Sequence, residues 1–145
     1  MYFATSNKYQ AYTYINPGAN KLNRNDYIKS FFMDFKNPLI IDNENKTFYN
    51  INYKGNIVAT DKLTELASKD GYDGIIIKNI KDFGENIEIL DDSEVELSIT
   101  NSSVYIAIDR PNQIKSATNN TGTFSTTNDR IDRFGEGKKS DIINK

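Results

Sequence analysis

Hydrophobic and polar positions alternate along this chain in short stretches that predict strands, interrupted by stretches with helical spacing. Residues 1–5 are aromatic and β-favouring, which predicts a strand. A helix is expected directly after it, because Ser6 or Asn7 can accept hydrogen bonds from the first free amides of a helix. The hydrophobic face of that helix, at spacings of three to four, is formed by Ala11, Tyr12 and Ile15.

The middle of the chain predicts two strands, one weak element and one well-marked helix. Hydrophobic side chains on both faces of residues 27–35 predict a largely buried strand, and residues 39–41 predict a short one. Residues 48–51 favour a weak strand or helix. Residues 60–70 form the helix, with Thr60 or Asp61 as its cap and Gly71 as its left-handed stop.

The second half predicts the centre of a sheet. Residues 74–77 are a continuous hydrophobic run, typical of a strand covered on both faces. Alternation over residues 87–99 predicts a hairpin, and residues 104–109 a last strand. We therefore expect one α+β domain over residues 1–117. The polar residues 118–145 are expected to form a mobile tail, except where Phe124 docks.

Composition removes several kinds of chemistry. The 145 residues include no His and no Cys, which excludes a His general base, Ser-His-Asp triads and ordinary zinc sites. A formal charge of −2, with Lys scattered among Asp and Glu, predicts no nucleic-acid partner. The chain has no hydrophobic run near the ~20 residues of a membrane helix and no N-terminal leader pattern, so we expect a cytoplasmic protein with no membrane partner.

One acidic run invites a metal interpretation. Its members are Asp91, Asp92, Glu94 and Glu96. Their spacing matches no oxygen-ligand pattern for a divalent cation, and the predicted hairpin tip makes a solvated turn the preferred interpretation. No metal is assigned.

Three blocks in a fixed order carry a resemblance to a known family. They are residues 2–4 with the following helix, residues 71–79 (GYDGIIIKN), and residues 104–109 leading into residues 113–117 (QIKSA). Residues 35–42 and 122–124 add to it. Together they resemble the ADP-ribosyltransferase-like domain of phage and prophage polyvalent proteins. The resemblance implies an α+β fold with mixed or antiparallel sheets and two main helices, with NAD as substrate and a protein as acceptor.

The wider superfamily is organised around His, Tyr and Glu on separate elements. In such domains two tyrosines sandwich the nicotinamide ring, and the resemblance assigns these positions to Tyr2 and Tyr12 when one residue of the intervening turn is removed. A flat cationic ring between two aromatic rings gains about 1 kcal/mol or more per ring. The alternative is that both tyrosines pack in the rim of the core. For residues 71–74 a mainly structural role is favoured, with Asp73 accepting from nearby amides and Gly74 allowing close approach of backbone.

Two features of the family pattern are not matched. The strand that carries His should precede Tyr2 by a few dozen residues, so the first strand is expected to be missing. Either the reading frame was shortened, or the domain has lost this strand, or another chain supplies it. A missing strand would leave a sheet edge exposed to self-association. The family Glu position falls on Val104, and Glu96 is the substitute carboxylate predicted from the hairpin. Two functions therefore stay open in a bacterial host cytoplasm: an NAD-dependent ADP-ribosyltransferase with impaired transfer, or a catalytically inactive binding or virion-associated module.

Overall fold

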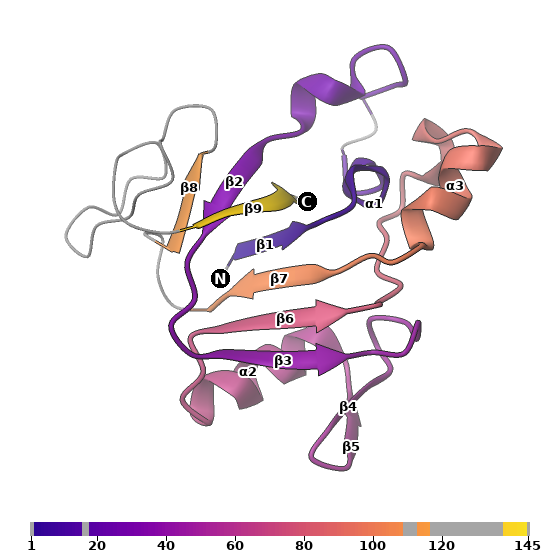
Figure 1. Cartoon of the computed structure of the whole chain (residues 1–145). Coiled ribbons are helices and arrows are strands. Elements are labelled where there is room, and N and C mark those ends of the chain that lie inside the picture. The colour runs from indigo at the N-terminus through magenta and orange to yellow at the C-terminus, as the bar shows by residue number, and fades with distance from the viewer. Residues whose placement is uncertain (1, 16–17, 109–112, 117–137, 145) are drawn as a thin grey trace.

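A seven-stranded sheet runs through the molecule (Figure 1). The structure, a computed structural model, describes residues 2–15, 18–108, 113–116 and 138–144, with the backbone alone at residues 2, 114–116 and 138–144. In spatial order the strands of the sheet are β3 (Pro38–Asp42), β6 (Gly74–Lys78), β7 (Val104–Ala107), β1 (Tyr2–Thr5), β9 (Lys138–Asn144), β2 (Ser30–Met33) and β8 (Ile114–Ser116).

The remaining described elements are helices and one separate hairpin. The hairpin consists of β4 (Ile51–Tyr53) and β5 (Asn56–Val58). The helices are α1 (Lys8–Tyr12), α2 (Thr60–Lys69) and α3 (Asp92–Ile99), with short 3₁₀ turns η1 (Arg24–Tyr27) and η2 (Ile87–Ile89). In the large sheet β3 and β6 are parallel, and every other described pair is antiparallel. The predicted α+β class with a mixed sheet is confirmed.

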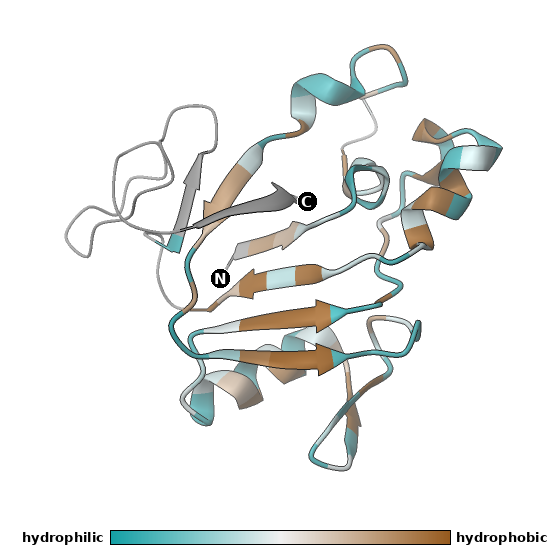
Figure 2. Cartoon of the chain, in the orientation of Figure 1, coloured by the Kyte–Doolittle hydropathy of each residue, from teal (hydrophilic) through white to brown (hydrophobic). Residues whose placement is uncertain are grey.

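The main core lies between α2 and the β3–β6–β7 end of the sheet. Leu63 and Ala67 of α2 have no exposed surface and belong to one cluster with Ile75 and Ile77 of β6 and Ile106 of β7. Figure 2 shows hydrophobic residues concentrated on these three strands. Burying such side chains contributes about 1.5–3 kcal/mol each before the entropic cost of ordering them. This hydrophobic contact holds α2 against the β3–β6–β7 end of the sheet.

Several local predictions are confirmed. Asn7 is the N-cap of α1, and its side chain accepts hydrogen bonds from the amides of Tyr9 and Gln10. Gly71 has a φ of +90° where α2 ends, a conformation that glycine adopts without steric penalty. The predicted cap of α2 was wrong: Ala59 holds that position without a side-chain hydrogen bond, and Thr60 already belongs to the helix.

Three strand predictions need correction. The hairpin over residues 87–99 is wrong, because this segment forms η2 and the helix α3. The weak element at residues 48–51 is displaced: β4 begins at Ile51 and turns through Lys54 and Gly55, both with positive φ, into β5. The run at residues 74–77 does form a strand, but β6 lies one strand from the sheet edge rather than at its centre.

The C-terminal segment contributes to the sheet. Residues 138–144, which the sequence places in a mobile tail, form β9 between β1 and β2 and pair antiparallel with both. The expected docking of Phe124 lies outside the described residues. The domain boundary at residue 117 stays a prediction. Within the part of the chain that the structure describes, no helix is long and hydrophobic enough to cross a membrane.

Candidate functional site

The two tyrosines of the predicted nicotinamide slot lie on β1 and α1. Tyr2 faces Ala107 of β7 across the sheet ladder, and its side chain lies outside the described residues. Tyr12 is the last residue of α1. The structure thus places the two residues on consecutive elements, as predicted, whereas the convergence of their rings stays a prediction.

Tyr12 is a core residue in this structure. Its side chain is 2% exposed and packs in a cluster with Ala19, Ile89 and Leu90. Its hydroxyl donates a hydrogen bond to Oδ1 of Asn25. Tyr9 meets its ring edge to face, with centroids 6.1 Å apart and an interplanar angle of 72°. The ring is therefore held by packing and by a hydrogen bond, and it presents almost no surface to solvent.

Arg24 lies over the Tyr12 ring. The guanidinium carbon is 4.3 Å from the ring centroid, within the range of a cation–π contact. Nη1 donates to the carbonyl of Ile89 at 2.9 Å and to Oε1 of Glu94 at 3.0 Å, and Nη2 donates to Oε2 of Glu94 at 2.5 Å. The guanidinium lowers the pKa of the Glu94 carboxyl through these hydrogen bonds, and Glu94 raises the pKa of Arg24 in turn.

The pair Arg24–Glu94 was missed by the sequence analysis. A readable pattern did exist, because Asp91 and Glu94 have the three-residue spacing of a capping box. In the structure Asp91 accepts from the amide of Glu94, and Glu94 accepts from the amide of Asp91. Because a hairpin was expected at these residues, the capping box was not considered. Glu94 and Arg24 lie 70 positions apart, so no local pattern predicts their contact.

Val104 and Glu96, the two positions considered for the catalytic carboxylate, lie in different environments. Val104, at the family Glu position, is completely buried in β7, where it is paired with Thr5 on one side and Ile77 on the other. Glu96 is exposed on α3, so it does not reach across from a neighbouring strand as predicted. The acidic run therefore lies on a helix and not on a hairpin tip. Among the described residues, no three Asp or Glu side chains lie close enough together to hold a metal ion.

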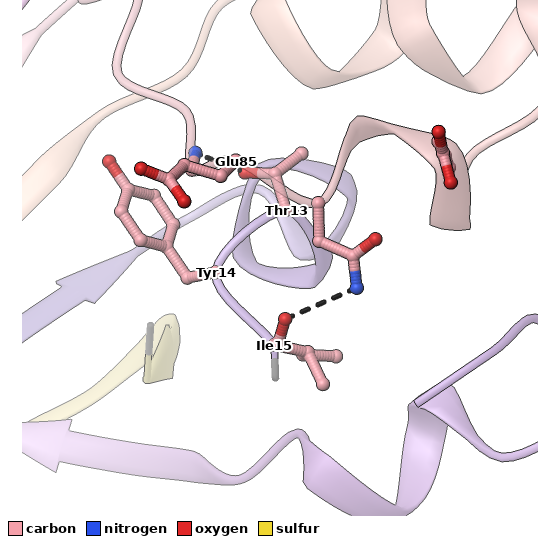
Figure 3. A pocket seen from close by; sticks show the side chains of 7 residues that line it. Thr13, Tyr14, Ile15 and Glu85 are labelled. Carbon is pink, nitrogen blue, oxygen red and sulfur yellow. Dashed lines mark hydrogen bonds between the residues drawn. The ribbon is translucent and has the colours of Figure 1, made fainter. Parts of the chain in front are cut away.

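A cavity of about 610 Å³ opens where the chain leaves α1 (Figure 3). One wall is formed by Thr13, Tyr14 and Ile15, and the other by Gly84, Glu85, Asn86 and Glu88. The amide of Gly84 donates to Oγ1 of Thr13 at 2.7 Å, and Nδ2 of Asn86 donates to the carbonyl of Ile15 at 3.2 Å. These bonds fix the loop against the end of α1.

The Gly71–Gly74 block has the structural role that was favoured. The Asp73 carboxylate accepts from the backbone amides of Lys36 and Asn37 at 2.6 and 2.8 Å. Nε2 of Gln113 donates to the Asp73 carbonyl at 3.1 Å. A Cβ on Gly74 would lie 2.4 Å from the Phe35 ring, so the close approach is made by a side chain and not, as predicted, by backbone. The block thus joins β2, β3 and the entry to β8.

Comparison with known proteins identifies the family. The family model described as "ADP-Ribosyltransferase in polyvalent proteins" matches residues 1–124. No curated protein matches the chain, and no solved structure matches it. The match spans all described elements except β9. The chain therefore belongs to the ADP-ribosyltransferase family of polyvalent proteins.

Proposed function

We propose that this chain is a phage- or prophage-derived domain that binds NAD as its substrate and in which ADP-ribosyl transfer is impaired. Membership of the family supports the substrate. The observation that carries the impairment is Val104, a hydrophobic residue without exposed surface at the position that the family resemblance assigns to Glu.

A carboxylate is needed because the ribose centre gains positive charge as the bond to nicotinamide breaks. Electrostatic stabilisation of such a centre commonly lowers the barrier by about 3 kcal/mol or more. Val104 has no group that can interact with this charge or orient an acceptor. Glu96 remains the proposed substitute, and its exposure on α3 supports slow rather than efficient chemistry.

The proposed nicotinamide slot uses Tyr2 and Tyr12. The face of Tyr12 that Arg24 covers would have to be vacated before a nicotinamide ring could stack there, because Arg24 lies 4.3 Å from the ring centroid. Weak affinity for NAD is therefore part of the proposal. Loss of a stacking ring should weaken NAD binding by about 1–3 kcal/mol, as for stacking on nucleobases.

Calorimetric titration with NAD tests the slot. Tyr2→Ala and Tyr12→Ala are each expected to weaken binding. Tyr12→Phe is the matched variant, since it keeps the ring and removes only the hydroxyl that bonds Asn25. Equal NAD affinity in the wild type and both Ala variants would remove Tyr2 and Tyr12 from the site.

Labelled NAD in a host lysate tests the chemistry. The wild-type chain is expected to give no measurable protein labelling and at most faint NAD hydrolysis. Glu96→Gln is the decisive variant. Robust labelling by the wild type that this substitution abolishes would show a working enzyme with Glu96 as its carboxylate.

A second candidate function is a catalytically inactive binding or virion-associated module. The burial of Tyr12 favours this inactive module, because the side chain is 2% exposed and packs in the core. A module of this kind binds no NAD, whereas the first proposal requires weak but measurable binding that depends on Tyr2 and Tyr12.

Association with other proteins is proposed on two grounds. A protein acceptor is proposed in the bacterial cytoplasm, and the family description supports an acceptor for ADP-ribose. Self-association through an exposed sheet edge is supported by β3, which among the described strands pairs on one side only and carries Ile40 at 57% exposure. Light scattering coupled to gel filtration checks it, and a strictly monomeric species at high concentration contradicts it.

A further inference from the structure

A second cavity, of about 490 Å³, shares Tyr14, Gly84 and Glu85 with the cavity of Figure 3. We name it the Phe83 cavity. Its aromatic wall consists of Phe3, Tyr14, Phe48 and Phe83, which come from β1, the end of α1 and two loops. Its volume is within the range of about 300–1,000 Å³ typical of small-ligand sites.

The rim of this cavity is acidic. The charged residues that line it are Asp61, Asp82 and Glu85. Asp61 and Glu85 are exposed, whereas Asp82 is 4% exposed and accepts a hydrogen bond from the Tyr14 hydroxyl. No Lys or Arg belongs to the described lining of the cavity. The described rim thus holds two exposed carboxylates, those of Asp61 and Glu85, which attract a cation.

The aromatic wall decides what kind of cation fits. Phe83 is 41% exposed and Tyr14 37%, so both aromatic residues are partly accessible to solvent. Aromatic faces attract organic cations, and a guanidinium both stacks on such a face and donates planar pairs of hydrogen bonds to carboxylates. A metal ion fits less well, since the described carboxylates do not converge as ligands. A compact ammonium would satisfy the rim but would not use the rings as a stacking surface.

We infer that the Phe83 cavity binds the guanidinium group of an arginine side chain presented by a partner protein. Asp61 and Glu85 supply the charge at the rim, and Phe83 and Tyr14 supply the stacking surface. Asp82 holds Tyr14 in place by accepting a hydrogen bond from the Tyr14 hydroxyl. This inference depends on neither NAD binding nor transfer, so it can fail or succeed independently of the proposed function.

The test is titration of the full chain, labelled with nitrogen-15, with N-acetyl-arginine amide. The backbone amides of Phe83, Gly84 and Glu85 are expected to shift at millimolar concentrations of the probe. N-acetyl-citrulline amide is the matched neutral probe, with the same shape and no charge, and it should produce no comparable shift. Added salt should weaken the arginine response, because the rim carboxylates Asp61 and Glu85 are exposed.

Substitutions locate the effect. Asp61→Asn combined with Glu85→Gln is expected to weaken binding about five- to tenfold, and Phe83→Leu about two- to fivefold. Glu88→Gln is the control, because Glu88 is an exposed carboxylate that lines only the neighbouring cavity. Equal responses to arginine and citrulline, or insensitivity to the rim and ring substitutions, would overturn the inference. An equal response to N-acetyl-lysine amide would overturn its guanidinium selectivity.

Discussion

Arg24 and Glu94 form two parallel hydrogen bonds, of 3.0 and 2.5 Å, across the interface between η1 and α3. The same carboxylate accepts from the amide of Asp91 at 3.1 Å and so closes the capping box of α3. On its other side the guanidinium covers Tyr12 of α1. This ion pair thus connects η1 and α3 with each other and with α1. Its guanidinium covers the tyrosine ring that the family resemblance assigns to stacking on the nicotinamide of NAD.

Removing this carboxylate should destabilise the protein. Glu94→Gln keeps an acceptor for the Asp91 amide but loses the ionic bonds to Arg24, and we expect it to lower the free energy of unfolding by about 1–3 kcal/mol. Glu94→Ala loses the cap as well and should cost about 1 kcal/mol more. Urea denaturation measures both. Glu96→Gln, at an exposed position on the same helix, should stay within about 0.5 kcal/mol of the wild type.

The same ion pair should make stability depend on pH on the acid side. Arg24 holds the pKa of Glu94 below its ordinary value, so the unfolded chain takes up a proton at a higher pH than the folded chain does. The stabilisation is therefore complete above the ordinary Glu pKa of about 4.3 and is lost as pH falls through the lower folded value. Thermal unfolding between pH 7 and pH 3 should show this loss, and Glu94→Gln should flatten it. An unchanged slope in that variant would contradict the assignment.

Gly84 should not tolerate a side chain. A Cβ at this position would lie 2.3 Å from the Thr13 carbonyl oxygen, a backbone atom that cannot rotate away. We expect Gly84→Ala to cost about 1–3 kcal/mol and to loosen the wall shared by both cavities. Gly18→Ala is the matched control, since no heavy atom lies within 4 Å of its Cβ position. Equal melting temperatures for the two variants would show that the loop can shift.

Restoring a carboxylate at position 104 should not restore an enzyme. Val104 has no exposed surface, and an unpaired buried carboxylate is strongly destabilising, by about 3 kcal/mol or more. Val104→Glu is expected to unfold or to fold only with the carboxyl protonated, and to transfer no ADP-ribose. Val104→Thr, which adds one buried hydroxyl, should cost less, about 1–3 kcal/mol. A well-folded Val104→Glu protein that labels an acceptor would show that β7 can open toward NAD.

Features that depend only on residues close together in the sequence could be predicted from the sequence. The cap at Asn7 and the stop at Gly71 follow from side-chain and backbone geometry within a few residues. The hydrophobic runs at β6 and β7 predict strands that are covered on both faces, and both strands are largely buried. The family resemblance followed from the order of three blocks and required no contact between them.

The helix α3 shows why the rest was not predictable. Alternation of Val95, Leu97 and Ile99 favours a strand, yet Leu97 is 47% exposed and the buried positions are the polar Glu94 and Ser98, one helical turn apart. A polar face is buried only when distant partners satisfy it, and the main partner of Glu94 is Arg24, 70 positions away along the chain. The sequence by itself determined the family, the helices α1 and α2 and the strands β1, β6 and β7. Only the tertiary structure decided that Tyr12 is covered by a cation, that Glu96 faces solvent, and that β9 enters the sheet, because each of these depends on contacts between segments remote from one another in the chain.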